Sequence, residues 1–243
     1  MTDPTSDIEG ISKILVVTAH PDDVDFGSGG TIARWTKAGV DVQYCIATDG
    51  DAGGFDEAVP RNEIGPIRRR EQTAAAKTVG VTQIHWLGYP DGRVTASLDL
   101  RRDISRVIRQ VKPDRVLAQS PERNWERIYA SHPDHLAVGE ATACAVYPDA
   151  RNPFAFPELL QQEGLKEHTV PELWLMAFSD ADEASDITDT FDTKVAALRC
   201  HESQVAHRDD LEQMLRGWSG AIASKMGLPE GRLAEAFRRV NTA

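Results

Sequence analysis

Two four-residue motifs combine the side chains that proteins use to hold metal ions and to move protons. His-Pro-Asp-Asp occupies residues 20–23, and His-Pro-Asp-His occupies residues 132–135. A random order of this composition, with its 7 His and 13 Pro, would contain roughly 0.03 copies of His-Pro-Asp. Imidazoles and one carboxylate form catalytic zinc sites that leave one coordination position open for water. The two copies therefore predict a metal site.

Each motif could also have a purely structural role. Proline fixes φ and aspartate caps a following helix, so His-Pro-Asp alone could be a turn. The second copy favours the metal site, and the Asp22-Asp23 pair adds a chemical feature, because one carboxylate can bind the metal while its neighbour acts as general base. Two histidines and one carboxylate can also hold Fe(II). We expect Zn²⁺, with another divalent metal such as Fe²⁺ as the alternative.

The elements that must position these motifs alternate between short apolar runs and longer amphipathic segments. Strands are expected at 13–19, 40–48, 83–88, 115–119 and 172–178, and helices at 29–39, 68–80, 99–111, 134–147 and 191–204. The alternation predicts an α/β fold: a single-domain, Rossmann-like, mostly parallel twisted sheet with helices on both faces. Ligands of such sheets bind beyond the carboxyl ends of the strands, and residues 20–23 follow the first of them.

The remaining segments are expected to belong to the same domain. It spans residues 1–243, with residues 1–11 flexible and residues 205–243 forming a C-terminal helical extension. The segments 51–66 and 148–170 show no regular pattern. Loops of this length inside a compact domain are often binding loops, so we expect them to shape the pocket.

The composition excludes several classes of partner. Lys and Arg number 27 against 38 Asp and Glu, a net charge of −11, which argues against binding nucleic acid or an anionic membrane surface. The acidic start MTDPTSDIEG lacks the basic residues of a signal peptide, and no apolar run is long enough to span a bilayer. The three Cys are widely spaced, as in reduced proteins. We expect a cytoplasmic protein without nucleic-acid or membrane partners.

The two motifs are part of a longer series. In chain order it contains Ala19-His20-Pro21-Asp22-Asp23, Gly27-x-Gly29-Gly30-Thr31, Thr48-Asp49-Gly50, Arg68-x-x-Glu71, Tyr89-Pro90-Asp91-Gly92, His132-Pro133-Asp134-His135 and Lys194-x-x-Ala197-Leu198-x-x-His201-x-Ser203-Gln204. Over about residues 13–204, the series resembles the PIG-L/LmbE-like metal-dependent de-N-acetylases. That family includes the GlcNAc-phosphatidylinositol de-N-acetylase, enzymes acting on sugar-conjugate thiols, and deacetylases of glycosylated natural products.

The resemblance implies roles for the residues of the metal site. Zinc would be held by His20, Asp23 and His135. Asp22 would act as general base on the metal-bound water, which would attack the amide carbonyl.

The resemblance also implies roles for residues around the metal. His132 would stabilise the oxyanion and protonate the leaving amine, and Asp91 would orient His132. Arg68 stands where the family often has a substrate-contacting arginine. As one of three consecutive arginines, it could equally be a solvated helix charge.

Two positions leave their roles open. Some members of the family have a tyrosine two residues before the first histidine of the second motif, but this chain has Ala130 there, with Tyr129 beside it. Oxyanion stabilisation would then depend more on zinc and His132. His201 matches the family pattern and could be either a ligand or a structural histidine; we favour the structural role.

The function implied is removal of an N-acetyl or short N-acyl group from an amino-sugar conjugate by a zinc-dependent hydrolase. A thiol-conjugate amidase of the same family is the nearest alternative. A nucleotide-binding module is the alternative from another class, because residues 27–30 read Gly-Ser-Gly-Gly, but the third glycine of the dinucleotide motif is missing. The expected partner is a small amino-sugar or glycoconjugate substrate. A homo-oligomer is compatible with such an enzyme.

Overall fold

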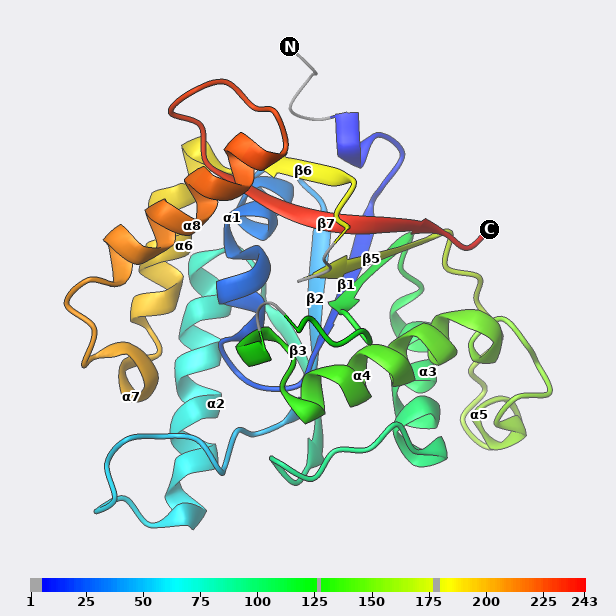
Figure 1. The fold of residues 1–243 in the computed structure, drawn as a ribbon. Coiled ribbons are helices and arrows are strands. Elements are labelled where there is room, and N and C mark those ends of the chain that lie inside the picture. The colour runs from blue at the N-terminus through cyan, green and yellow to red at the C-terminus, as the bar shows by residue number, and fades with distance from the viewer. Residues whose placement is uncertain (1–5, 126–127, 177–179) are drawn as a thin grey trace.

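A seven-stranded sheet runs through the centre of the molecule (Figure 1). The computed structural model describes residues 6–125, 128–176 and 180–243. The strands are β1 (Lys13–Thr18), β2 (Asp41–Thr48), β3 (Gln83–Tyr89), β4 (Arg115–Gln119), β5 (Glu172–Met176), β6 (Glu183–Asp186) and β7 (Ala234–Asn241). Their order is β3-β2-β1-β4-β5-β7-β6, with the first five parallel and β7 antiparallel to both neighbours. The predicted single-domain α/β fold with a mostly parallel sheet is confirmed.

Helices cover both faces of this sheet. The α-helices are α1 (Asp23–Lys37), α2 (Arg61–Thr78), α3 (Leu98–Val111), α4 (Pro133–Cys144), α5 (Pro157–Gln161), α6 (Phe191–Arg199), α7 (Glu202–Val205) and α8 (Leu211–Lys225). Short 3-10 helices span Ser6–Ile8, Ile128–Ala130 and Thr188–Thr190, and a π-helical turn spans Ala145–Asp149. Figure 1 shows α3 and α4 on one side of the sheet and α1, α2 and α6 on the other.

The apolar run of β1 explains why it lies at the centre. Leu15 and Val17 pack into the core beneath α3 and α4, whereas Ile14 and Val16 pack into the core beneath α1 and α2. A strand buried on both faces needs apolar residues at successive positions rather than at alternate ones. The run therefore places the end of β1, and the motif that follows it, in the middle of the carboxyl edge.

Several elements begin or end away from their expected bounds. Helix α1 begins at Asp23, six residues before the expected start, because tertiary packing outweighs the low helix propensity of its glycines. Helix α2 begins at Arg61, so the expected loop 51–66 ends at residue 60, and the loop 148–170 contains α5. The helix expected over 191–204 divides into α6 and α7.

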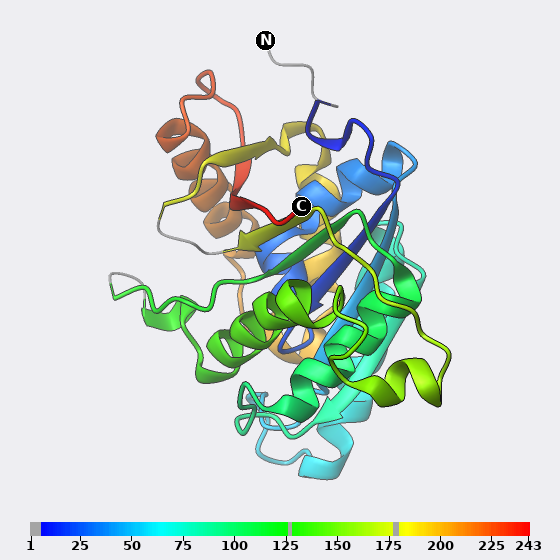
Figure 2. The same cartoon turned by 90° about the vertical axis from the view of Figure 1, so that its right-hand side faces the viewer.

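The C-terminal segment corrects the expectation of a purely helical extension. After α8 the chain returns to the sheet as β7, which lies between β5 and β6. Strand β7 pairs with the edge of β5, and Phe237 is fully buried against Trp174. Pairing satisfies the backbone groups that an unpaired β5 would expose. Figure 2 shows β7 and α8 at the end of the sheet away from β3.

The described part of the N-terminal segment contacts helix α1. Residues 1–5 of the expected flexible stretch lie outside the described residues. Within the next residues, the Asp7 carboxylate accepts hydrogen bonds from Arg34 at 2.5 Å and from Trp35 at 3.0 Å.

Among the described residues, no helix is both long and apolar enough to cross a membrane.

Candidate metal centre and active site

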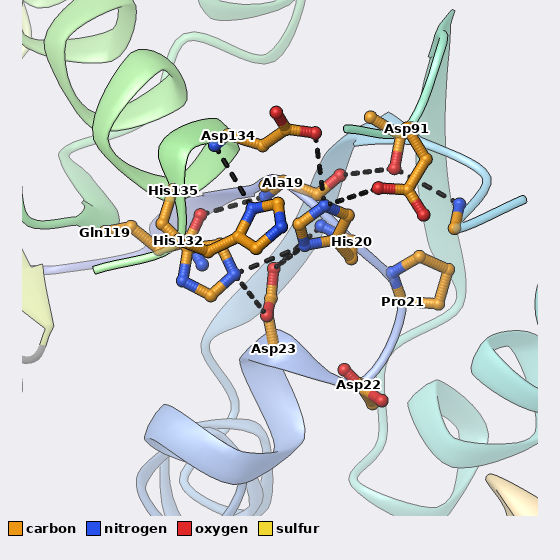
Figure 3. Close-up of polar contacts among 12 residues, drawn as sticks. Ala19, His20, Pro21, Asp22, Asp23, Asp91, Gln119, His132, Asp134 and His135 are labelled. Atoms are coloured by element: carbon orange, nitrogen blue, oxygen red, sulfur yellow. Dashed lines mark hydrogen bonds and ion pairs between the residues drawn. The ribbon is translucent and has the colours of Figure 1, made fainter. Parts of the chain in front are cut away.

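The two motifs meet at the carboxyl edge of the sheet, although 115 residues separate His20 from His135. His20 and Asp23 come from the end of β1 and the start of α1, while His132 and His135 come from the start of α4 (Figure 3). The Nδ1 atom of His20 lies 3.2 Å from Nε2 of His135. The prediction that the motifs share one site agrees with this arrangement.

Three side chains present donor atoms at mutual distances suited to one small metal ion. Asp23 lies with Oδ2 3.3 Å from His20 Nδ1 and with Oδ1 3.0 Å from His135 Nε2. In a tetrahedral zinc site with bonds of 2.0–2.1 Å, ligand atoms are separated by about 3.3 Å. His20, Asp23 and His135 could therefore hold a zinc-sized ion without a large rearrangement.

Carboxylates on the far side of His20 orient its ring. His20 Nε2 lies 3.0 Å from Asp91 Oδ1 and 3.3 Å from Asp134 Oδ2. Asp134 is itself fixed by backbone N–H groups of Gly92 at 2.8 Å and Val94 at 3.2 Å. A proton on Nε2 shared with these carboxylates leaves Nδ1 facing Asp23 and His135, which is the arrangement that supports histidine ligands in metal sites.

The charges around His20 favour a cation at this position. Burial lowers the pKa of His20, but the carboxylates of Asp23, Asp134 and Asp91 outweigh it and raise the pKa to about 12. The imidazoles of His135 and His20 hold the pKa of Asp23 well below its usual range despite burial. A bound metal ion would take the place of the proton that these carboxylates stabilise.

Asp91 has a different partner from the one expected. It contacts His20 rather than His132, because the His20 ring lies between them, as Figure 3 shows. The contact with His20 lowers the pKa of Asp91 to about 2, against the effect of burial. Asp134 is the second carboxylate partner of His20. It was not predicted as a site residue, although it lies in the His-Pro-Asp-His motif, because the two histidines of that motif were the stronger signals.

His132 is exposed and stands at the N-terminus of α4. Its Nδ1 accepts a hydrogen bond from the backbone N–H of Asp134 at 3.2 Å, which caps the helix. Burial, together with repulsion from His20 and His135, lowers the pKa of His132. The remaining ring nitrogen, Nε2, is the one that can exchange a proton with a ligand.

Asp22 is held in a conformation that non-glycine residues rarely adopt, with φ +79°. Its backbone N–H donates to Gln72 Oε1 at 2.7 Å, and its Oδ2 accepts a hydrogen bond from Arg68 at 3.1 Å. Burial raises the pKa of Asp22 to about 6, although Arg68 opposes this shift. A carboxylate with a pKa near the working pH is suited to accept and release a proton.

Arg68 is 4% exposed, and this burial argues against the expected substrate contact. Its guanidinium donates to the carbonyl oxygens of Pro21 at 2.7 Å and Gly50 at 3.1 Å, and to Asp22. A side chain at position 50 would collide with the guanidinium, and Gly50 also has φ +67°. Arg68 therefore holds Asp22 and the loops around it rather than facing a ligand.

The sequence model of one family, described as PIG-L: GlcNAc-PI de-N-acetylase, matches residues 15–146, more than half of the chain. The chain belongs to the PIG-L family. The family indicated by the sequence motifs is thereby confirmed, and the matched segment contains both His-Pro-Asp motifs.

Known relatives of this PIG-L chain extend the match beyond that segment. The diacetylchitobiose deacetylase of Thermococcus kodakarensis is 32% identical over 245 residues, covering 99% of this chain and 86% of the relative. The probable N-acetyl-α-D-glucosaminyl L-malate deacetylase 2 of Bacillus cereus is 31% identical, with 87% and 90% covered. The solved N,N'-diacetylchitobiose deacetylase of Pyrococcus horikoshii is 32% identical, with a TM-score of 0.88, and the match covers 99% of this chain and 88% of that one.

A buried hydrogen-bond network that the sequence did not predict lies beside the candidate site. Asp25 Oδ2 accepts hydrogen bonds from Gln72 and from His201, each at 2.9 Å, and all three residues are fully buried. His201 therefore has the structural position that was favoured for it. Gln72 was missed because it belongs to no motif, whereas Asp25, two residues after the aspartate pair, could have been found.

A cavity of about 710 Å³ adjoins the donor set. Asp23 and His135 are among its lining residues, and α8 contributes Trp218 and Ile222 to its wall. Tyr129 also lines it and is 67% exposed. Helix α8 lies outside the segment matched by the family model, so this wall is not part of the region that identifies the family.

Proposed function

We propose that this PIG-L protein is a zinc-dependent amidohydrolase that removes an N-acetyl or short N-acyl group from a small amino-sugar conjugate. The observation that carries the proposal is the set of donor atoms on His20, Asp23 and His135. The two imidazole nitrogens lie 3.2 Å apart, and each lies 3.0 to 3.3 Å from a different carboxylate oxygen of Asp23. The relatives named as deacetylases of diacetylchitobiose and of a GlcNAc-malate conjugate support the same chemistry.

The donor set fits zinc in number and chemical type. Two imidazoles and one carboxylate leave a coordination position open, as in catalytic zinc sites. When bound, zinc supplies a Lewis acid that polarises the amide carbonyl and makes water a stronger nucleophile at neutral pH. Fe²⁺ could occupy the same ligands, so the metal content has to be measured.

Asp22 is our candidate for the general base. It neighbours the proposed ligand Asp23, and burial raises its pKa to about 6. At neutral pH most of its population is then ionised and can accept a proton from the attacking water. Arg68 keeps the carboxylate in place and limits the effect of burial.

His132 is our candidate for the general acid. Its Nδ1 accepts the N–H of Asp134, so the neutral ring carries its proton on Nε2. To act as an acid, the ring must first take up a proton on Nδ1 in place of this hydrogen bond; Nε2–H can then donate to the amide nitrogen and leave a neutral ring. Burial and repulsion from His20 and His135, which lower the pKa of His132, favour release of that proton. Attack by water and cleavage of the C–N bond yield a carboxylate and an ammonium. Asp22 takes one proton of the water, and the amide nitrogen receives one proton from His132 and the second proton of the water. Transfer of the Asp22 proton to His132 through solvent restores both residues.

The nucleotide-binding alternative has an electrostatic obstacle. In dinucleotide-binding folds, the pyrophosphate sits at the N-terminus of the helix that follows the first strand. Here Asp22 and Asp23 occupy that position, and their charges would repel a phosphate. A thiol-conjugate amidase would use the same residues, so only the choice of substrate distinguishes it.

The test combines metal analysis with a substrate panel. Purified enzyme is analysed for zinc and iron, and primary amine release is measured on N-acetylglucosamine, N,N'-diacetylchitobiose, GlcNAc-malate and GlcNAc-inositol. We expect about one zinc per chain and a loss of about a hundredfold or more in kcat for Asp22→Asn and for His132→Ala. Asp192→Asn, at an exposed position, is the matched control. Full activity in Asp22→Asn would refute the general-base role, and zinc retained after loss of both His20 and His135 would refute the site.

A further inference from the structure

The cavity beside the donor set has an apolar wall made mainly by α8. Its described lining includes Met214, Leu215, Trp218, Ile222 and Met226, with Met176 at the end of β5. The chain has four methionines, and all except Met1 line this cavity. Methionine side chains are flexible and polarizable, and they adapt to apolar ligands of varied shape. The wall is therefore suited to a flexible apolar group.

Two polar side chains of the cavity lining, Lys194 and Gln119, are already bonded to other parts of the protein. Lys194 donates to Glu235 at 2.5 Å and to the Phe26 carbonyl at 2.7 Å, while Gln119 accepts the N–H of Ala19 at 2.9 Å. At these two side chains the hydroxyls of a second sugar would lose water and find few new partners, which is unfavourable, whereas Asn124, Arg208 and Lys225 add polar groups elsewhere in the lining. An alkyl chain would not have this penalty.

The positions of the proposed acid and base indicate which part of a substrate enters the cavity. Of the described residues that line it, Asp23 and His135 belong to the donor set, and none is Asp22, Asp91 or His132. If His132 protonates the leaving nitrogen, the amino sugar lies on the His132 side of the carbonyl carbon. The acyl group then extends to the other side, toward Met176 and α8.

We propose that this enzyme hydrolyses amino sugars carrying medium-length N-acyl chains, with the chain bound in the cavity along α8. The inference rests on the proposed hydrolase function and extends the acyl group from acetyl or short acyl to medium-length chains. Water adds to the acyl carbon, the C–N bond breaks, and the nitrogen takes up both protons of the water as an ammonium. The products are a medium-chain carboxylate and the free amino sugar.

The experiment uses the zinc-loaded enzyme and a series of N-acylglucosamines with acetyl, butanoyl, hexanoyl and octanoyl groups. We expect kcat/KM to rise by roughly threefold to fourfold for each methylene buried, until the cavity is filled. A second arm compares methyl and octyl glycosides of N-acetylglucosamine, in which the alkyl group is on the sugar instead. We expect little gain in that arm.

Variants of the wall test where the chain binds. Trp218→Ala removes a large apolar surface, and Met214→Gln replaces a thioether by a polar group of similar length. Each should reduce the octanoyl-to-acetyl ratio of kcat/KM by about tenfold. Trp125→Ala is the matched control, because Trp125 is 80% exposed and is not among the described lining residues; it should leave the ratio within twofold.

The outcomes separate this inference from the function on which it rests. Hydrolysis of the acetyl substrate without any gain for longer acyl groups would overturn the inference and leave the hydrolase proposal standing. A gain confined to the octyl glycoside would also overturn it, because the cavity would then bind the aglycone. Amine release from no substrate at all would refute both.

Discussion

The two ends of the sheet contribute differently to the site. The parallel end, from β3 to β4, supplies the donor set and the candidate acid and base from the loops after its strands. The antiparallel end, with β6, β7 and α8, supplies none of them, but α8 contributes a large apolar part of the wall of the adjoining cavity. The family model matches residues 15–146 and so covers the parallel end up to α4. This division suggests that chemistry and substrate selection are built by separate parts of the chain.

A buried ion pair joins the two ends. Glu235 of β7 accepts the backbone N–H groups of Gly30 and Thr31 in α1, at 3.1 and 2.8 Å, and pairs with Lys194 of α6. Helix α1 begins with Asp23, one of the three proposed metal ligands. The C-terminal strand thus helps to fix the helix that carries a ligand, although it lies far from the ligands in sequence.

Removing the metal should produce the largest difference between the two ends. Stripping the enzyme with a chelator should reduce amine release by about a thousandfold or more, because the proposed Lewis acid is lost. Metal binds the folded state, so the melting temperature should fall as well. Hydrogen exchange should increase at residues 19–25 and 132–136 but not in α8, which packs into its own apolar cluster with α6.

Restoring zinc should reverse both effects, and adding magnesium should not, because the site offers nitrogen ligands. Exchange that increases equally in α8 would contradict the division into two ends. Unchanged activity in the metal-free protein would contradict the proposed mechanism.

Breaking the ion pair between Lys194 and Glu235 should lower the free energy of unfolding, because this pair connects the two ends of the sheet. Lys194→Met leaves the Glu235 carboxylate charged and without its counter-ion. Both positions are buried, since Lys194 is 3% exposed and Glu235 is 2% exposed. Loss of one member of such a pair costs about 3–5 kcal/mol. Urea unfolding should report this loss, and Lys166→Met, at an exposed position, is the matched control.

The double variant Lys194→Met with Glu235→Gln should recover part of the stability, because the buried charge is removed. If the free energy of unfolding of Lys194→Met lies within about 1 kcal/mol of the wild-type value, the ion pair does not stabilise the contact between the two ends.

Gln72→Leu should affect the parallel end alone. The substitution leaves the Asp22 N–H and one hydrogen bond of Asp25 without their partner, and Asp22 already has an unfavourable φ. We expect kcat to fall roughly tenfold to a hundredfold while KM changes little, because the candidate base is displaced and the cavity is not. Gln110→Leu, on the exposed side of α3, is the control.

Gln72→Glu separates the two hydrogen bonds of Gln72, because a carboxylate can still accept the Asp22 N–H but cannot donate to Asp25. A carboxylate at position 72 keeps a similar shape but would repel Asp25, and it cannot donate the hydrogen bond that Gln72 donates. Activity should fall at least as far as in Gln72→Leu. Activity close to that of the wild type in both variants would mean that Asp22 does not need this support.

The parallel end could be predicted from sequence because its signals are local. The apolar run of β1 and the His-Pro-Asp motifs are contiguous, and strand ends in a parallel sheet meet at one edge. Partners across the site were harder to predict. Whether Asp91 faces His20 or His132 depends on how far β3 extends along the sheet relative to β1. Arg68 differs from its two arginine neighbours because its guanidinium faces the backbone of Gly50.

The antiparallel end lacked such signals. The sequence of β7, AEAFRRVN, carries three charged residues, which obscured the alternation of a strand. Glu235 is nevertheless buried, because Lys194, 41 residues earlier, supplies its counter-charge. A pattern that depends on a distant partner cannot be recognised from local composition.

The smallest effect concerns the amino edge of the sheet, opposite the site. Asp114, just before β4, accepts hydrogen bonds from the backbone of Ser12 and Lys13 at 2.8 and 2.9 Å and from the Ser12 hydroxyl. Burial raises the pKa of Asp114, but these hydrogen bonds outweigh it, so the pKa lies below its usual value. The unfolded chain therefore binds this proton more tightly than the folded chain.

It follows that the stabilisation from Asp114 is fully present above the unfolded pKa of about 3.9 and is lost as the pH falls through the lower folded pKa. Asp114→Asn should be less stable than the wild type by about 1 kcal/mol at pH 7, and the difference should shrink toward pH 2. Urea unfolding at both pH values measures this, with Asp192→Asn as control. Amine release at pH 7 should stay within twofold of the wild type, because the amino edge holds β1 in place without touching the donor set. A difference that grows as the pH falls would have the wrong sign for a carboxylate stabilised in its charged form.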